Sequence, residues 1–244
     1  MRNVVAYCCL CVVVSPFLNA QEKSKLPANT LYACNFRENS RLYTIDPATG
    51  DEKEVGKIGE ETTDIAFVGN QLYGLSFDSL FEIDPLTGEA SAALPHGIEQ
   101  LNALVAIPND TTGFYAMAAI AADTTKGAPF VRVDRSSGRA SVIGHLGKGL
   151  SSAGDLVFVN GKLYATLNSE DTDTTCWVSI DPKSGKATLI SDTTIEGIWG
   201  LEVRNGKLFG ATKLGWVLTI DPSTGGSTMI GTTGLVLGGM AKSP

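Results

Sequence analysis

The chain has 244 residues, of which 43% are hydrophobic, and its formal net charge is −7 at pH 7. This length allows one large domain or two small ones, and the apolar fraction is sufficient for a packed core. Because the chain is acidic and shows no basic run, nucleic acid and anionic membrane surfaces are not expected partners.

The N-terminal stretch has the pattern of a secretory signal. Arg2 gives a short positive region, an apolar stretch follows at 4–14, and the small residue Ala20 ends the segment. The apolar stretch is too short to span a bilayer, and Ala20 suits signal-peptidase cleavage. We therefore predict a signal peptide at 1–20, a mature domain at 21–244, a secreted or periplasmic location and no membrane insertion. The alternative is a buried N-terminal strand.

A short motif then recurs five times along the chain. It reads TIDPATG at 44–50, EIDPLTG at 82–88, RVDRSSG at 132–138, SIDPKSG at 179–185 and TIDPSTG at 219–225. Asp accepts hydrogen bonds from turn amides, Pro presets φ at the next position, and Gly takes the positive φ that ends a turn. The motif therefore predicts structural turns, rather than chemistry, at Asp46, Asp84, Asp134, Asp181 and Asp221.

A second motif, an apolar, an aromatic and a small residue, alternates with the first. It occurs at 31–33, 72–74, 114–116, 163–165 and 208–210, and apolar runs at 64–68, 102–107, 155–159 and 200–203 precede the last four copies. Each unit thus has an inner strand a, an aromatic strand b, a strand c that ends at the Asp, and a strand d such as 89–94. Consecutive apolar residues indicate sheets buried on both faces, and such four-stranded repeats are typical of propellers.

The two ends of the chain complete one another. The mature chain begins with strands b, c and d, and it ends with an a-like strand at 234–241. The sequence therefore predicts an all-β, five-bladed β-propeller with four strands per blade, closed by the C-terminal strand a. Cys34 and Cys176 fall in blades 1 and 4, which are not neighbours, so we expect two unpaired thiols in a monomeric protein.

The IDPxTG turns and the LYG strand resemble the repeats of a broad superfamily of secreted propellers, which includes quinoprotein-like, surface-layer and gluconolactonase-like proteins. The resemblance covers nearly the whole mature chain and implies the fold, which hosts many functions. Quinone enzymes of this type have a tryptophan after the turn. The corresponding stretches here read EASAAL, RASVIG and KATLIS, so no quinone is predicted.

The b–c and d–a loops lie on one rim and include the longest loops, at 118–129 and 168–175. Insertions on one face of a repeat protein often mark its binding side. The candidate rim residues are His96, Asn102, His145, Asp155 and Trp199. The starts of the a strands offer a calcium site at Asp64, Asn102 and Asp155, because Ca²⁺ binds carboxylate and amide oxygens. Gluconolactonase-type propellers hold a metal in a similar place; alternatively, these residues cap strand-start turns.

Two function classes remain open. The first is a secreted binding or scaffold propeller that uses this rim for a protein, a glycan or a small ligand. The second is a calcium-assisted hydrolase of the lactonase or esterase type with its site at the channel mouth. Asp64, Asp155 and Glu202 also imitate the carboxylates of five-bladed glycosidases. The chain has no nucleophile elbow, zinc-helix motif or phosphate loop, and its blades are regular, so binding is favoured.

Overall fold

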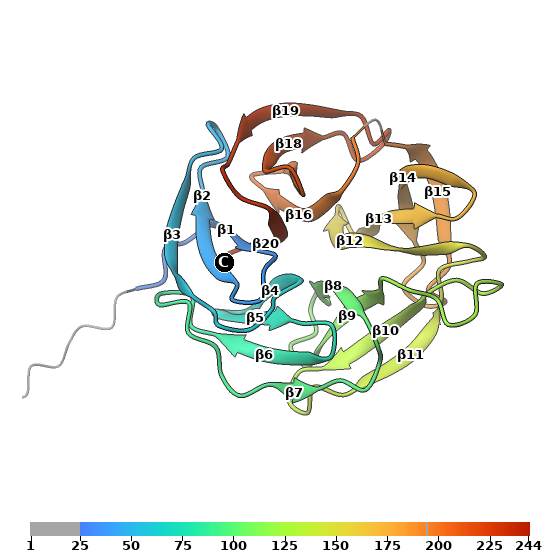
Figure 1. Ribbon diagram of the computed structural model, residues 1–244, viewed down its shortest axis with the longest axis horizontal. Helices are drawn as coiled ribbons and strands as arrows, with labels where there is room; N and C mark the ends of the chain where they lie inside the picture. Colours follow the sequence, from blue (N-terminus) through green and yellow to red (C-terminus); the bar gives the residue numbers. More distant parts are fainter. Residues whose placement is uncertain (1–24, 194) are drawn as a thin grey trace, which may run out of the picture.

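The structure, a computed structural model, describes residues 25–193 and 195–244. The predicted signal peptide therefore lies outside the described residues. Within them, the chain forms five antiparallel sheets of four strands each, arranged radially around a central axis (Figure 1). The prediction of an all-β, five-bladed propeller is confirmed. No helix in the described part of the chain is long and apolar enough to span a membrane.

Each blade runs from an inner strand a to an outer strand d. The strands of blade 1 are β20 (Leu237–Lys242), β1 (Leu31–Asn35), β2 (Arg41–Ile45) and β3 (Glu52–Lys57). Those of blade 2 are β4 (Asp64–Val68), β5 (Gln71–Leu75), β6 (Ser79–Ile83) and β7 (Leu94–Pro95). Those of blade 3 are β8 (Leu101–Ala106), β9 (Gly113–Ala118), β10 (Pro129–Asp134) and β11 (Ala140–His145).

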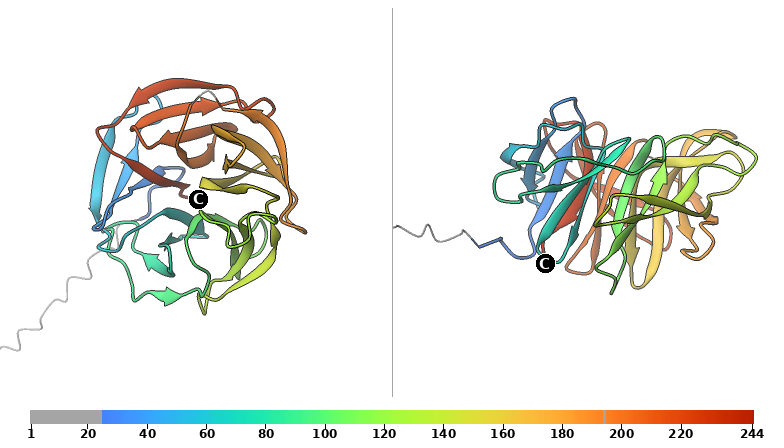
Figure 2. Two further views of the ribbon diagram at one scale, coloured as in Figure 1. Left: turned by 45° about the vertical axis from the view of Figure 1, so that its right-hand side comes forward. Right: turned by 90° about the horizontal axis from the view of Figure 1, so that it is seen from below.

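The last two blades follow the same order. The strands of blade 4 are β12 (Leu150–Val159), β13 (Lys162–Ser169), β14 (Thr172–Ile180) and β15 (Ala187–Asp192). Those of blade 5 are β16 (Ile198–Arg204), β17 (Lys207–Thr212), β18 (Trp216–Ile220) and β19 (Ser227–Thr232). The side view in Figure 2 shows the strands running from one rim of the ring to the other.

The ring closes where the two ends of the chain meet. Strand β20 pairs antiparallel with β1, and the register places Met240 opposite Ala33 and Lys242 opposite Leu31. All five residues of β1 are buried, because neighbouring sheets cover both faces of the blade. Leu237 and Met240 pack into the same hydrophobic cluster as Leu31. The C-terminal strand is therefore an integral part of blade 1, as the sequence predicts.

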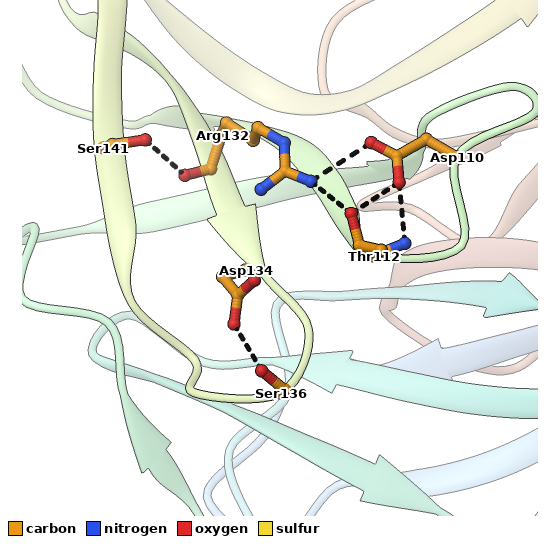
Figure 3. A network of polar contacts seen from close by, with 6 residues as sticks. All are labelled: Asp110, Thr112, Arg132, Asp134, Ser136 and Ser141. Atoms are coloured by element: carbon orange, nitrogen blue, oxygen red, sulfur yellow. Dashed lines mark hydrogen bonds and ion pairs between the residues drawn. The ribbon is translucent and has the colours of Figure 1, made fainter.

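The IDPxTG motif forms the same turn in every blade. The Asp carboxylate accepts a main-chain N–H two or three residues further on, at 2.8–3.0 Å, and the Gly N–H donates to the Asp carbonyl at 2.7–2.9 Å. In blade 3, where Arg135 replaces the proline, Ser136 Oγ and Ser137 Oγ also donate to Asp134 (Figure 3). Hydroxyl groups also donate to the Asp in the turns of blades 4 and 5, which keep the proline, so the turn forms with or without it.

These turns also hold the blades together. A Cβ on Gly185, in the turn of blade 4, would lie 2.8 Å from the Phe130 Cβ and 3.2 Å from the Gly144 carbonyl carbon of blade 3. A Cβ on Gly144 would in turn lie 1.8 Å from the Ser184 oxygen. In blade 4, Ser191 occupies the position that Gly144 holds in blade 3. Its hydroxyl donates at 2.7 Å to Thr224 O, in the turn of blade 5. Each such turn therefore docks on the outer strand of the preceding blade.

Two local predictions need correction. The outer strand expected at 89–94 in blade 2 is only β7, with an isolated bridge between Ile83 and Ala90. The small side chains of this stretch have weak strand preference, and Pro95 has no N–H for the ladder. The loop expected at 168–175 mostly extends strands β13 and β14 into a longer hairpin, with Ser169 opposite Thr172.

The two cysteines lie apart in the ring. Cys34, on β1, is buried and unpaired, and its Sγ accepts the Gly239 N–H at 3.3 Å. Cys176, on β14, is also buried, and its Sγ lies 3.6 Å from Asp192 Oδ1. No disulfide joins the two residues. Burial raises the pKa of the Cys34 thiol to about 12, so this thiol stays protonated and unreactive.

Candidate functional site

A pocket of about 220 Å³ lies on the axis at the rim of the b–c and d–a loops, and all five blades contribute to its wall. Two repeat positions build this axial pocket. In each blade, one residue of strand a pairs with the aromatic residue of strand b. The first position lies three residues before that strand-a residue. It is occupied by Thr63, Asn102, Gly154, Trp199 and Gly238. Every one of these residues lines the pocket.

The second position is four residues after the aromatic of strand b. It is occupied by Phe36, Phe77, Ala119, Asn168 and Lys213, and the first four of these line the pocket. Both positions lie at strand ends, so the rigid sheets hold most of the lining in place. Gln100, Ser152 and Ala153 complete the wall.

Three aromatic rings stand together in the axial pocket. The ring of Phe36 lies 5.9 Å, centroid to centroid, from both the Phe77 ring and the Trp199 ring. The interplanar angles are 80° and 82°, so the outer two rings each stand nearly perpendicular to Phe36. All three side chains are half-buried, which leaves ring surface available inside the pocket. Edge-to-face packing fixes their mutual orientation.

Amide side chains supply most of the polarity of the pocket. Asn168 Nδ2 donates to the Ser152 carbonyl at 3.3 Å. Asn102 Oδ1 is buried and has no hydrogen-bond partner. Gln100 has a φ of +60°, a left-handed conformation that is uncommon outside glycine, and its carbonyl accepts the Ala119 N–H at 2.8 Å. The wall therefore combines strained backbone with an acceptor that the protein itself leaves unsatisfied.

A pair of buried carboxyl groups lies directly beneath the pocket. Asp64 and Asp155 follow the lining residues Thr63 and Gly154, and their exposed fractions are 0% and 1%. Asp64 accepts the N–H groups of Ile65 at 2.7 Å and of Leu104, in blade 3, at 2.6 Å. Asp155 accepts the N–H groups of Leu156 and of Leu201 in blade 5. Each carboxyl thus joins its blade to the next.

The two carboxyl groups also lie close enough for each to shift the ionisation of the other. Burial raises the pKa of both side chains well above the ordinary value of 3.8, and the charge of Asp64 raises the pKa of Asp155 further. Two buried carboxylates in contact cannot both ionise at low energy, so the pair retains a proton that the two groups share.

Calcium does not fit the residues predicted to hold it. The oxygens of Asp64 and Asp155 face main-chain N–H groups, which repel a cation. Asn102 lies one repeat position away from them, because Ala103 pairs with Met117 as Asp64 pairs with Leu75, so Ala103 holds the place equivalent to Asp64. Within the described residues, no three His, Cys, Asp or Glu side chains gather in a way that could hold an ion.

The other predicted rim residues are dispersed. Asn102 and Trp199 line the axial pocket. His96 is buried, and it bonds Ser76 O through Nε2 and the Ile98 N–H through Nδ1, each at 3.3 Å. Burial lowers the His96 pKa, which keeps this ring neutral. His145 is exposed at the end of β11, away from the pocket, and Glu202 accepts the Lys242 N–H at 2.9 Å instead of facing the mouth.

Sequence reasoning missed Phe36, Phe77, Gln100 and Asn168. A usable signal was present, since Phe36 and Phe77 both stand four residues after the tyrosine of strand b. Aligning the units on that tyrosine, rather than on the start of strand a, would have placed both phenylalanines on one rim. The strained Gln100 has no comparable signature.

Comparisons with known proteins agree with the fold. No protein-family model and no curated protein sequence matches the chain. The structure is similar to TolB from Acinetobacter baumannii, with a TM-score of 0.53 and 11% identity, over 88% of this chain and 55% of TolB. It is also similar to hydrazine synthase of Kuenenia stuttgartiensis, with a TM-score of 0.49 and 18% identity, over 79% and 61% of the two chains. The chain thus spans less than two thirds of either protein, and the likeness to TolB shows the β-propeller fold alone.

Proposed function

We propose that the protein is an exported binding protein that holds a small organic ligand in the axial pocket. The observation that carries this proposal is the convergence of two repeat positions on one pocket with three aromatic rings and three amide side chains. Ligand sites in proteins are concave and largely apolar, with a few polar groups that fix the orientation of the ligand. The pocket has this composition, and strand ends position most of its wall.

Binding is favoured over hydrolysis by the chemistry of the lining. Among the residues that the structure describes, the wall of the axial pocket contains no Asp, Glu, His, Cys, Lys or Arg side chain. General acid–base and nucleophilic catalysis require such groups within reach of the substrate. The hydroxyl of Thr63 donates to Leu75 O, and that of Ser152 accepts the Gly154 N–H, so both are engaged with the main chain.

The binding proposal is tested with a thermal-shift and tryptophan-fluorescence screen of the purified chain against monosaccharides, amino acids and alkylamines. We expect a saturable response that is lost in Phe77→Ala. The matched control is Leu86→Ala, which truncates an exposed apolar side chain on the opposite rim of the same blade and should leave the response unchanged. A panel without response, or a response that survives both Phe77→Ala and Trp199→Ala, would contradict the proposal.

Export is proposed from the sequence of residues 1–20. The test is expression of the full chain in a bacterial host, followed by intact-mass analysis of the secreted or periplasmic fraction. We expect a mature chain that begins at Gln21. Recovery of the uncleaved chain from the cytosol alone would contradict the proposed export without affecting the proposed binding site.

A further inference from the structure

We propose that the ligand of the axial pocket is a small organic cation that carries an alkylated ammonium group. This inference rests on the proposed binding function and specifies its ligand class. Three features support it: the arrangement of the aromatic rings, the absence of positive charge from the pocket, and the negative charge of the grooves that adjoin it.

The aromatic rings form a partial cage. Phe77 and Trp199 stand nearly perpendicular to Phe36, with both centroids 5.9 Å from its centroid. Ring surfaces thus face the pocket from more than one direction. A cation is attracted to the face of an aromatic ring within about 6 Å, and cages of several rings are a recurrent way to bind quaternary ammonium groups.

Positive charge is kept out of the pocket. No Lys, Arg or His side chain of the described part of the chain lines it. In blade 5, Lys213 occupies the second repeat position, which holds Phe36, Phe77, Ala119 and Asn168 in the other blades. Lys213 is not part of the pocket wall. Its Nζ lies 3.5 Å from Glu196 Oε2, and its aliphatic stem packs against Gly197. The one cation at an equivalent position is therefore turned aside and neutralised.

An acidic groove leads into the pocket. Its lining includes Glu60, Glu61, Asp78 and Glu99, and it shares Phe77 and Gln100 with the axial pocket. The groove has a volume of about 450 Å³, and none of the described residues that line it is basic. Clefts lined by charge of one sign concentrate ligands of the opposite sign. The groove therefore favours the approach of a cation.

A second groove adjoins the other side of the pocket. It shares Ala119 and Asn168 with the axial pocket, and its one charged lining residue is Glu170. Charge of the same sign thus flanks the aromatic cage on two sides. A neutral ligand would gain nothing from this arrangement, and an anionic ligand would be repelled.

The size and the polar groups of the pocket point to a small ligand. Its volume of about 220 Å³ lies below the roughly 300–1,000 Å³ that is common for drug-sized ligands. Asn102 lines the pocket, and its Oδ1 is a buried acceptor without a partner, so rotation of this side chain would offer the acceptor to a hydroxyl on a short substituent of the cation. A hydroxyalkyl ammonium ion of the size of choline has the required charge, shape and donor.

The test compares shape-matched ligands by calorimetric titration. The probes are choline, tetramethylammonium and 3,3-dimethylbutan-1-ol, which has the shape of choline without its charge. We expect choline to bind at least about tenfold more tightly than the neutral alcohol, because that factor corresponds to about 1.4 kcal/mol, within the range of desolvated cation–π contacts. We also expect added salt to weaken the binding of choline, since screening reduces the attraction of the acidic groove.

Variants locate the interaction. Phe77→Ala and Trp199→Ala should each weaken choline binding at least about tenfold, and Trp199→Phe should retain part of it because the ring is kept. Glu99→Gln should weaken choline binding about twofold to fivefold and reduce its salt dependence. The matched control Glu89→Gln makes the same charge change on the opposite rim and should have no effect. Unchanged melting temperatures verify that each variant is folded.

The outcomes separate this inference from the proposed function. If the neutral alcohol or a monosaccharide binds as tightly as choline and Phe77→Ala abolishes that binding, the pocket binds a ligand but the cation inference is wrong. If a trimethyl-lysine peptide binds while choline and tetramethylammonium do not, the ligand is a protein side chain, and the small-molecule inference is wrong. If none of these probes binds in the pocket, the cation inference is wrong, and if the whole panel of monosaccharides, amino acids and alkylamines also gives no response, both proposals fail.

Discussion

Acidic side chains of the inner strands link neighbouring blades through main-chain hydrogen bonds. Asp64 connects β4 to β8, Asp155 connects β12 to β16, and Glu202 connects β16 to β20. A Cβ on Gly239 would lie 1.8 Å from Asp64 Oδ1, so the axis is filled at this level. The residues that sequence patterns suggest for metal binding therefore serve cohesion of the ring, and they form the base on which the pocket stands.

The shared proton of Asp64 and Asp155 predicts a pH dependence of stability. Their pKa values are raised on folding, so the folded state binds more protons, and its stability falls as pH rises above the ordinary pKa of 3.8. Asp155→Asn removes the shared proton and leaves the Leu201 N–H without its carboxylate acceptor. We expect this variant to be about 1–3 kcal/mol less stable than the parent near pH 4.

We further expect the stability difference between the variant and the parent to narrow as pH rises, because two buried carboxyl groups ionise in the parent, whereas only Asp64 does so in the variant. Urea denaturation of the variant and the parent at about pH 4, 6 and 8 measures this difference in the free energy of unfolding. The control Glu89→Gln changes an exposed carboxyl and should give a curve parallel to that of the parent. Parallel curves for Asp155→Asn and the parent would show that the two carboxyl groups do not share a proton.

The same contacts predict that calcium has no effect on the fold. Because N–H donors already occupy the oxygens of Asp64 and Asp155, millimolar CaCl₂ should leave the melting temperature of the parent unchanged. A thermal-shift measurement with and without the salt is sufficient. A rise in the parent that disappears in Asp155→Asn would restore the calcium site and, with it, the alternative of a metal-assisted hydrolase.

At the scale of elements, the c–d turn combines two tasks in one motif. Its Asp and Gly close the turn, and the same Gly lets the turn approach the outer strand of the preceding blade. Arg132 fastens another connection: its guanidinium donates to Asp110 at 3.1 Å and to Thr112 at 2.6 Å, which ties the a–b loop of blade 3 to strand c (Figure 3). Short loops thus carry much of the contact between neighbouring elements.

Two glycines of blade 4 distinguish the need for a positive φ from the need for close packing against a neighbouring blade. Gly185, in the c–d turn, has φ +73°, and Gly161, in the a–b turn, has φ +78°. A Cβ on Gly161 would meet nothing within 4 Å, whereas a Cβ on Gly185 would crowd blade 3. Gly161→Ala should therefore destabilise by about 1 kcal/mol through the left-handed backbone alone.

Gly185→Ala should destabilise by about 1–3 kcal/mol more than Gly161→Ala, because the turn must move away from Phe130 and Gly144. Urea denaturation of both variants gives the comparison. Equal losses would mean that the turns make no important contact with the preceding blade, and that the recurrence of the motif reflects turn formation alone.

The repeated motifs made the strands and turns predictable from the sequence. The axial pocket was not predictable in this way, because its lining depends on how strand a pairs with strand b in each blade. The aromatic strands and the Asp turns recur with simple spacing, so blade number and closure follow from the sequence. The a strands begin at different distances from their aromatics because the a–b loops and the register shifts differ between blades. In the sequence, Asn102 and Asp64 both stand at the start of a strand a and look equivalent. In the structure, the equivalent of Asn102 is Thr63, one position before Asp64. Burial of Asp64 and Asp155 is a tertiary property that a strand-start position does not reveal.

At the scale of the whole molecule, the two rims differ in character. One rim has the five c–d turns, which dock on neighbouring blades. The other has the axial pocket and the acidic groove, where half-buried aromatic rings line the pocket and the buried Asn102 Oδ1 has no hydrogen-bond partner. Such a division keeps stabilising contacts away from the face that we propose binds the ligand, so loops on that face can vary without loss of the ring. This division between the two rims requires that the ring of blades stays closed.

Closure by β20 predicts a strong effect of deleting residues 234–244. The deletion removes Leu237 and Met240 from the core and leaves β1, which is buried along its whole length, as an open edge. Exposed apolar edges pair with other chains, so we expect oligomers in size-exclusion chromatography with light scattering, and a loss of at least about 3 kcal/mol in urea denaturation.

The control for this deletion is the removal of Ser243 and Pro244 only. It loses the bonds of Ser243 Oγ to Pro27 O and to the Thr30 N–H, at 2.6 and 2.8 Å, but it keeps β20. We expect this shorter deletion to remain monomeric with a small loss of stability. If the chain that lacks 234–244 is also monomeric, with an unchanged urea midpoint, β20 does not hold the ring closed. In that case the axial pocket, which includes Gly238 of this strand, would need another explanation for its shape.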